Sequence, residues 1–467
     1  MAKAGLLPHM NDRGEKKSAL VVATFSSFLT PFLATSINIA LPAIQSQFHA
    51  DAVLLSWVAT AFLLSTAVSL VPAGRLADIY GRKKVFLRGM ILVTAASLLT
   101  AFSISVPMLI FFRIFQGIGT AMIFSTQMAI LTSIFPPGER GSVLGINVAA
   151  VYAGLSCGPF FGGALTQHLS WRSLFLVPLP LCLISIYLIY KKLKGEWAEA
   201  RGESFDLKGS LIYGATLVML VFGLSRLPSI SSIALLISGG LGLAAFVKWE
   251  LTVQHPVFEV TLFSTNRVFA FSCLAALIHY SATFALTFMM SLYLQYIKGL
   301  TPQMAGLVLM AQPLMMALFS PLAGKTSDRI EPRWIASGGM ALMAFGLISL
   351  SRIGGETGML YIVLLLLLIG FGYALFSSPN MNAIMSSVER RYYGVAAGSV
   401  ATMRLIGQMF SMGIATLILS LYIGRVEITP ENYSDFLRSV NTAFVVFAIL
   451  SCAGIFLSMA RGELRNE

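Results

Sequence analysis

Long apolar windows, separated by short polar stretches, run through almost the whole chain. Windows of roughly 18 to 25 residues have the length of a helix that crosses a bilayer. The pattern predicts fourteen such helices and no soluble domain. The predicted spans are 18–43, 53–74, 85–104, 107–134, 142–165, 172–191, 208–225, 231–250, 268–296, 303–323, 334–351, 358–381, 394–422 and 439–460.

The composition agrees with this pattern. Of the 467 residues, 57% are hydrophobic and only 11% are charged, which leaves too little polar surface to cover a soluble globule. The apolar run from about Ser18 to Ile44 exceeds the core of a signal peptide, so it predicts a first helix that is retained. The net charge of +12 is spread over short loops, so it does not indicate a nucleic-acid partner.

The distribution of Lys and Arg predicts the orientation. With the amino terminus placed inside, 24 of the 32 basic residues fall in inside loops or tails and 6 fall outside. The remaining two, Arg113 and Arg404, lie within spans. Basic residues concentrate on the cytoplasmic side of membrane proteins. We therefore expect a multi-pass protein of the cell (inner or plasma) membrane with both termini in the cytoplasm.

Metal and nucleotide chemistry find little support in the sequence. The four cysteines, Cys157, Cys182, Cys273 and Cys452, all lie inside apolar segments, so neither a disulfide framework nor a metal cluster is expected. No phosphate-binding glycine loop is present, which argues against ATP hydrolysis. We expect no enzyme activity, no cofactor and no metal.

A charged stretch lies between the second and third predicted spans, and a similar stretch lies between the tenth and eleventh. Each copy has a glycine, three further residues, an aspartate and then cations, and each follows the second helix of a six-helix set. The two copies contain Gly74, Asp78, Gly81 and Arg82 in the first and Gly324, Asp328 and Arg329 in the second. The repeat predicts two related halves, 18–191 and 267–460, joined by a linker with two extra helices, 192–266.

Several motifs together resemble the major facilitator superfamily, and within it the fourteen-helix branch of drug:proton antiporters. The stretch around Asp78 is similar to the family's signature loop, although Ile79 stands where arginine is usual. Other similar motifs are Arg113–Gly119, Gly154–Gly163, Trp171–Phe175, Tyr293–Gln295 with Gly299 and Gly306, Ser378–Asn380 with Asn382, and Arg404 with Gly407. The resemblance covers nearly the whole chain.

The resemblance implies an all-α fold of the same 6+2+6 plan and transport by alternating access. It implies a gating role for the repeated loops, in which Asp78 pairs with Arg82 or caps a helix of the other half. It also identifies an antiporter motif, Gly154, Gly158, Pro159, Gly162 and Gly163, as a seal on one side of the pathway. Glycines every four residues form a smooth helix face, so packing alone is the simpler explanation of this motif.

The acidic residue that this branch places in the first helix is missing here, because Leu33 occupies its position. All twenty Asp and Glu fall in loops, tails or span ends. The spans instead carry Arg113, His279 and Arg404. A charge at mid-bilayer costs about 3 kcal/mol, so we expect these groups to face the protein interior or a cavity.

Helical spacing places polar residues in stripes that predict one shared polar cavity. One stripe holds Arg113, Gln116, Thr120 and Gln127, another Arg404, Gln408 and Ser411, and a third Ser272, His279 and Thr283. The candidates for substrate binding or coupling are Asn38, Arg113, Gln116, His279, Gln312, Asn380, Asn382, Arg404 and Gln408. Hydrogen bonds that only hold helices together, or a structural histidine at position 279, remain alternatives.

Three functions remain open from the sequence. The first is a proton-linked exporter of small amphipathic compounds or drugs, acting as a monomer among membrane lipids. The second is an exporter of an anionic or weak-acid metabolite, which the basic interior favours. The third is a membrane sensor or scaffold that does not transport.

Overall fold

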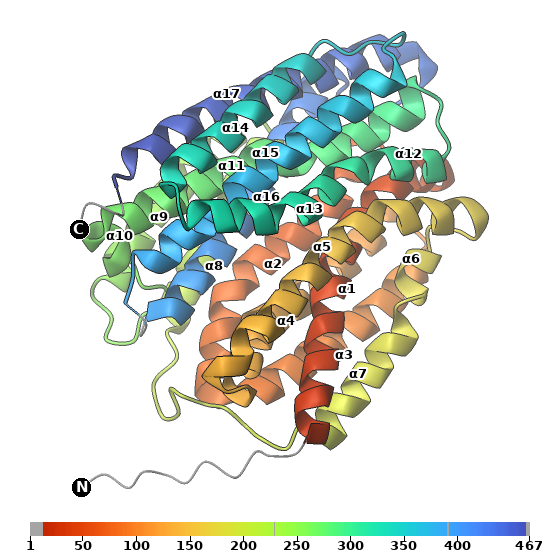
Figure 1. Ribbon diagram of the computed structural model, residues 1–467. Coiled ribbons are helices and arrows are strands. Elements are labelled where there is room, and N and C mark those ends of the chain that lie inside the picture. Colours follow the sequence, from red (N-terminus) through yellow and green to blue (C-terminus); the bar gives the residue numbers. More distant parts are fainter. Residues whose placement is uncertain (1–12, 228, 390–391, 464–467) are drawn as a thin grey trace, which may run out of the picture.

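The computed structural model describes residues 13–227, 229–389 and 392–463, and every regular element in these residues is helical (Figure 1). Fourteen of the helices are long and apolar enough to cross a membrane, which confirms the predicted all-helical class and the number of spans. The spans are Gly14–Phe48, Ala52–Tyr80, Arg82–Ala101, Val106–Ile134, Ser142–His168, Ser173–Lys192, Leu207–Ser225, Ile230–Glu250, Arg267–Ile297, Pro302–Ser327, Pro332–Leu350, Met359–Ser386, Tyr393–Tyr422 and Pro430–Ala460.

The first half contains α1 to α7. Their bounds are α1 Arg13–Phe48, α2 Ala52–Tyr80, α3 Arg82–Ala101, α4 Val106–Ile134, α5 Pro137–His168, α6 Ser173–Leu176 and α7 Leu179–Lys192. The extra helices and a short connector follow as α8 Leu207–Ser225, α9 Ile230–Glu250 and α10 Thr261–Thr265.

The second half begins after this connector. It contains α11 Arg267–Leu292 with a π turn at Tyr293–Ile297, α12 Pro302–Leu309, α13 Ala311–Ser327, α14 Pro332–Leu350, α15 Met359–Ser386, α16 Tyr393–Tyr422 and α17 Tyr433–Ala460. Part of the predicted charge pattern, at 1–12, 390–391 and 464–467, lies outside the described residues.

Two spans that the sequence predicts as continuous are interrupted. The sixth divides into α6 and α7 at Val177–Pro178, and the tenth divides into α12 and α13 at Met310. Proline has no N–H to donate and its ring crowds the preceding turn. Pro178 and Pro313 therefore explain the two breaks.

Helix α1 begins and α17 ends at the same end of the helix bundle, α1 at the bottom and α17 at the left of Figure 1. We call this end the termini side and the opposite end the far side. An even number of spans returns the chain to the side from which it started, so the arrangement follows directly from fourteen spans.

The two halves pack in the same pattern. In the first half α1 packs on α5 and α7, and α3 packs on α4 and α7, while α2 packs on α4. In the second half α11 packs on α16 and α17, and α14 packs on α15 and α17, while α13 packs on α15. Each pair in one half thus has a counterpart in the other, as the sequence repeat implies.

The halves meet along two equivalent seams, one between α5 and α12–α13 and the other between α16 and α2. The extra helices α8 and α9 pack on each other, and α8 also contacts α2 and α16. The extra pair therefore lies beside one of the seams.

Glycines allow α5 to approach α1 closely. A Cβ atom added to Gly154 would lie 2.3 Å from the Phe28 carbonyl oxygen, and one on Gly158 would lie 2.0 Å from Thr35 Oγ1. In the second half, a Cβ on Gly407 of α16 would lie 2.5 Å from the Leu277 carbonyl oxygen of α11. The same helix pair in each half thus depends on a missing side chain.

Candidate functional site

A cavity of about 120 Å³ lies between the two halves at the middle of the spans. The first half contributes wall residues from α1, α2, α4 and α5, and the second half from α11, α12, α13, α15 and α16. Four of the sequence candidates or their stripe partners line it on the second-half side, namely Thr283, Gln312, Arg404 and Gln408, and Tyr280 lies beside them. From the first half come Asn38 and Thr120.

Arg404 of α16 is the only formally charged side chain among the lining residues. Its Cζ lies 5.3 Å from the ring centroid of Phe124 on α4, so the contact spans the two halves. Among the described residues, no hydrogen bond or ion pair holds the Arg404 guanidinium. An unneutralised cation in a largely apolar cavity attracts negative charge and electron-rich rings.

Asn38 provides a second polar group in the cavity wall. Neither Oδ1 nor Nδ2 of its side chain has a hydrogen-bond partner among the described residues, although the residue is only 1% exposed. A buried amide without partners loses hydration energy. The Asn38 amide is therefore free to donate to and accept from a bound molecule.

Aromatic rings form much of the remaining wall. They are Phe62, Phe124, Tyr280, Phe284 and Tyr373, and together they come from both halves. The sequence analysis did not select them, because an aromatic residue inside an apolar span has the same pattern whether it faces a cavity or the core. Their gathering suits a molecule with ring surfaces.

Arg113 does not line the cavity, contrary to the predicted shared stripe. It is fully buried in the first half, where Nε donates to the Val58 carbonyl and Nη1 donates to the Leu33 carbonyl and to Gln116 Oε1. Its Cζ also lies 4.1 Å from the centroid of Phe62, which does line the cavity. At the position of the missing acid, the Leu33 backbone thus serves Arg113 as an acceptor.

Gln116 belongs to the same buried network, since its Nε2 donates to Ser97 Oγ at 2.7 Å. Gln127 is also buried away from the cavity, as are Ser272 and Ser411 in the second half. The prediction of one shared polar cavity is therefore wrong for these positions. Helical spacing fixes which residues share a face, but not which neighbour that face meets.

His279 of α11 is likewise fully buried outside the cavity wall. Its ring stacks on Phe376 with centroids 3.9 Å apart and contacts Tyr373 edge-on. Neither ring nitrogen has a hydrogen-bond partner among the described residues. The surroundings of His279 are those of an aromatic core residue.

Asn380 and Asn382 of α15 lie toward the termini side rather than in the cavity. Asn380 accepts from Arg461 Nη1 at 3.0 Å and donates to the Ser272 carbonyl. Burial beside these neutral groups lowers the pKa of Arg461 to about 10. The two asparagines contact other parts of the second half and are not among the residues that line the cavity.

Hydrogen bonds between the halves close the cavity on the far side. Ser291 Oγ donates to the Asn38 carbonyl at 2.8 Å, and Gln295 Nε2 donates to the Ile39 carbonyl at 3.1 Å. Closer to the far end, the Ala52 amide donates to the Val426 carbonyl. These contacts join α1 and α2 to the second half.

The antiporter motif takes part in the same closure. A Cβ on Gly163 would lie 2.2 Å from the Pro302 carbonyl oxygen, and one on Gly306 would lie 2.2 Å from the Pro159 carbonyl oxygen. The remaining motif glycine, Gly162, faces Ser36 of α1. In this structure the motif thus brings α5 against both α1 and α12 at the far side.

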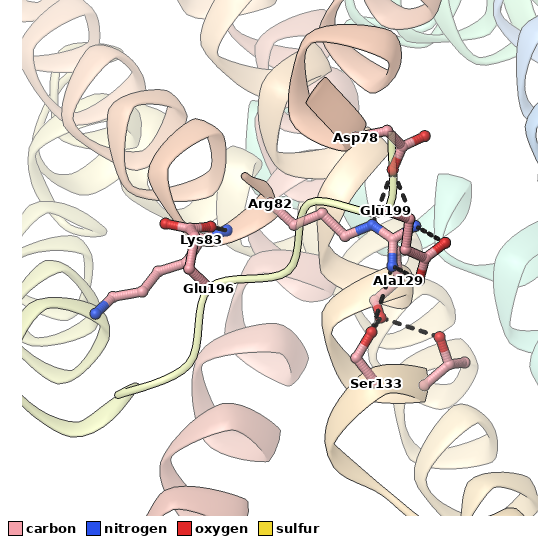
Figure 2. Close-up of polar contacts among 8 residues, drawn as sticks. Asp78, Arg82, Lys83, Ala129, Ser133, Glu196 and Glu199 are labelled. Atoms are coloured by element: carbon pink, nitrogen blue, oxygen red, sulfur yellow. Dashed lines mark hydrogen bonds and ion pairs between the residues drawn. The ribbon is translucent and has the colours of Figure 1, made fainter. Parts of the chain in front are cut away.

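The first repeated loop forms a compact ionic cluster on the termini side. Arg82 Nε donates to Asp78 Oδ1 at 2.9 Å, and both Nη atoms donate to Glu199 at 2.8 and 3.0 Å. Figure 2 shows the Arg82 side chain directed toward Asp78, Glu199 and Ser133. The resemblance implied that Asp78 either pairs with Arg82 or caps a helix of the other half. In this structure Asp78 pairs with Arg82.

A segment that we call the strap, residues 193–206, covers this loop (Figure 2). The Ala200 amide donates to the Asp78 carbonyl, and the Arg82 amide donates to the Trp197 carbonyl. Gly81 has φ +114°, and a Cβ there would lie 2.3 Å from Glu196 Oε1. The positive φ favours glycine at this turn, and the missing side chain also makes room for the strap. The strap was not predicted from the sequence, where its signal is the three acidic residues Glu196, Glu199 and Glu203 in the segment that follows the first half.

The second repeated loop has a simpler arrangement. Asn382 Nδ2 donates to Asp328 Oδ1 at 3.2 Å and to Ser327 Oγ at 2.9 Å. A Cβ added to Gly324 would lie 3.7 Å from Ser378 Cβ of α15, and one added to Gly74 would lie 3.6 Å from Ser125 Cβ of α4. These are ordinary contact distances, so neither Gly74 nor Gly324 allows an especially close helix approach in this structure. The equivalent placement of the two glycines nevertheless follows the repeat.

The described residues contain no group of three or more His, Cys, Asp or Glu side chains that could hold a metal ion.

Comparisons with known proteins agree with this architecture. The chain is 29% identical to the riboflavin transporter RibZ of Clostridioides difficile (strain 630) over 438 residues, which cover 92% of each protein. It is 30% identical to the multidrug resistance protein Stp of Mycobacterium tuberculosis (strain ATCC 25618 / H37Rv) over 411 residues, 86% of this chain and 76% of that protein. It is also 30% identical to the puromycin resistance protein pur8 of Streptomyces alboniger, over 85% of this chain and 80% of that protein.

Solved structures share the fold at low sequence identity. A D-xylose-proton symporter has a TM-score of 0.65 at 14% identity, with 93% of this chain and 97% of that chain covered. A peptide transporter POT has a TM-score of 0.68 at 15% identity, with 94% and 95% covered. The sequence pattern of the Major Facilitator Superfamily matches residues 23–277 and 272–463. The chain therefore belongs to the Major Facilitator Superfamily, a family of secondary membrane transporters rather than enzymes.

Proposed function

We propose that this transporter exports small amphipathic compounds that combine ring surfaces with a negative or electron-rich group. The observation that carries this proposal is the cavity wall, where Arg404 is the only charged side chain and aromatic rings surround it. A lipophilic cation would have to enter beside an unneutralised guanidinium, which Coulomb repulsion disfavours. Anionic and neutral ring compounds meet no such barrier.

The relatives support export of such compounds. Two of them are named for resistance to multiple drugs or to puromycin. The relative named for riboflavin suggests a second candidate cargo, a neutral polar ring system. The hydrogen-bonding groups of Asn38, Gln312 and Gln408 in the wall suit that cargo as well.

The proposal includes alternating access in the cell membrane, with both termini in the cytoplasm and the chain acting as a monomer. The units that move would be the halves 18–191 and 267–460, with 192–266 between them. In this structure the far side is held shut by the Ser291 and Gln295 hydrogen bonds, so the cavity would face the cytoplasm. The gate candidates would act when the cytoplasmic side closes, with Asp78 then exchanging partners.

We propose a proton gradient as the energy source. The cavity wall contains no carboxylate among its lining residues, so a proton would have to travel on the substrate or bind elsewhere in the chain. A weak-acid substrate satisfies the first route, since its protonated and ionised forms differ in charge.

The test uses inverted vesicles containing the full-length protein and an imposed pH gradient. Anionic, neutral and cationic fluorescent ring compounds of similar size are compared in wild type, Arg404→Ala and Arg404→Lys. We expect gradient-driven accumulation of the anionic or neutral compound, a loss of tenfold or more in Arg404→Ala, and partial recovery in Arg404→Lys. Accumulation of the cation alone, unaffected by either change, would overturn the proposal. Arg425→Ala, at an exposed position on the far side, is the matched control.

A further inference from the structure

Two carboxylates meet at the termini-side ends of the extra helices, away from the cavity. Asp206 is the N-cap of α8, and Glu250 is the last residue of α9. Between them lies Gly209, where an added Cβ would be 2.2 Å from Asp206 Oδ2 and 2.4 Å from Glu250 Oε1. The two oxygen atoms therefore lie on either side of the same small space.

Glu250 is buried to an unusual degree for an acid at a span end, with 4% exposure. Its Oε2 accepts from the Phe258 amide at 2.8 Å, but Oε1 has no hydrogen-bond partner among the described residues. Buried polar atoms are nearly always hydrogen-bonded. The unpartnered oxygen is the one that points to Gly209 and Asp206.

Asp206 is held in place by three contacts. Its Oδ1 accepts from the Gly209 amide at 2.9 Å, and both carboxylate oxygens accept from Trp249 Nε1, at 3.2 and 3.0 Å. These donors fix the Asp206 carboxylate beside Glu250. The indole also brings the α9 end against the α8 start, so the two acids cannot easily separate.

The surrounding charges do not neutralise the pair. On α8, Lys208 lies with its Nζ 5.4 Å from the Trp249 ring centroid, and on α9 Lys248 is exposed. From α2, Arg75 pairs with Glu203 of the strap, and His255 of the loop after α9 pairs with the same carboxylate. Glu259, the other acid of that loop, adds negative charge. Among the described residues no cation forms an ion pair with Asp206 or Glu250.

We propose that Glu250 and Asp206 bind one proton between them and so form a proton site in the extra helix pair. Two adjacent carboxylates, one of them buried, cannot both ionise without a large electrostatic cost. A proton on Glu250 Oε1 removes one charge and gives this oxygen a donor hydrogen directed at Asp206 Oδ2. The chain thus carries a proton-binding carboxylate that its cavity lacks, next to the strap. This inference does not depend on which substrate is carried.

The test is infrared difference spectroscopy of the purified full-length protein in lipid nanodiscs, between pH 5 and pH 9 in H₂O and D₂O. We expect a protonated-carboxyl C=O band that titrates, shifts in D₂O and is absent in Glu250→Gln. Glu356→Gln, which changes an exposed acid, should retain the band. A band that persists unchanged in Glu250→Gln, or no such band in wild type, would overturn the proposal.

A second variant guards against a mere folding defect. Asp206→Asn keeps Glu250 but removes the neighbouring charge, so Glu250 should lose its proton at a lower pH than in wild type. An unchanged titration in Asp206→Asn would contradict a shared site.

Replacing potassium by sodium at constant ionic strength should leave the band unchanged, and a shift caused by sodium would assign the pair to a metal cation instead. Neither result depends on transport, so failure of this proposal is distinguishable from failure of the proposed function.

Discussion

The two halves of this transporter pack their helices in the same pairs, yet they use their intramembrane arginines differently. Arg113 in the first half is enclosed by backbone carbonyls, Gln116 and the Phe62 ring. Arg404 in the second half faces the cavity with no hydrogen-bond partner among the described residues. Arg113 therefore stabilises the packing of its own half, whereas Arg404 faces the cavity in which we propose that the substrate binds.

The two repeated loops at the termini side also differ in the number of contacts that hold their charged side chains. Arg82 in the first half is locked by Asp78, Glu199 and Ser133 beneath the strap. In the second half Asp328 is exposed, and Asn382 donates to its carboxylate at 3.2 Å. The two copies of the repeated stretch therefore occupy equivalent positions, but only the first copy is covered by the strap.

The largest expected effect is on the free energy of unfolding, which should differ between variants of the two intramembrane arginines. Arg113→Ala should lower the free energy of unfolding by about 2–4 kcal/mol, because it opens a cavity and leaves buried acceptors unpaired. Arg404→Ala should change it by less than about 1 kcal/mol, since among the described residues its guanidinium contacts the Phe124 ring but has no hydrogen-bond partner to lose. Thermal unfolding of both variants in the same detergent measures this, and a larger loss for Arg404→Ala would break the comparison.

Alanine substitutions at equivalent glycines test whether the two halves pack their helices alike. Gly154→Ala and Gly407→Ala should each cost about 1–3 kcal/mol, because the new Cβ meets a backbone carbonyl of α1 or α11. Gly74→Ala and Gly324→Ala meet ordinary contact distances and should be nearly neutral. Folded yield and melting temperature report the effect. If Gly154→Ala were tolerated while Gly407→Ala was not, the two halves would not be packed alike.

Because of the strap, alanine substitution of an arginine should destabilise the first repeated loop more than the second. Arg82→Ala removes hydrogen bonds to three side chains and should cost about 1–3 kcal/mol, whereas Arg329→Ala at an exposed position should cost less than about 1 kcal/mol. Protease sensitivity of residues 193–206 gives an independent readout, and it should rise only in Arg82→Ala. Equal effects of the two changes would show that the strap does not distinguish the loops.

The smallest effect is expected at His279. His279→Phe keeps the stacking on Phe376 and removes two buried ring nitrogens that lack partners. Stability should stay within about 1 kcal/mol of wild type, and transport with its pH dependence should stay within about twofold. Vesicle transport at several pH values measures this. Loss of the pH dependence would instead identify His279 as a proton carrier.

The sequence by itself determined the membrane class, the fourteen spans and the repeat. These rest on apolar length and on local motifs, which the bilayer and the backbone constrain directly. It also selected Arg404, Gln408, Gln312 and Asn38, because a polar residue inside a span must meet the protein interior. The breaks at Pro178 and Pro313 were readable in principle from the prolines.

Only the tertiary structure decided which polar residues share the cavity. Arg113 and Arg404 are the same residue type and both lie inside apolar spans, and only helix packing places one behind Phe62 and the other at the cavity. The contact of the strap with Asp78 and the placement of Glu250 beside Asp206 also depend on helix packing, because the residues of each pair are 44 or more positions apart in the chain. Periodicity describes one helix at a time, whereas a site is made by the faces that several helices turn toward one another.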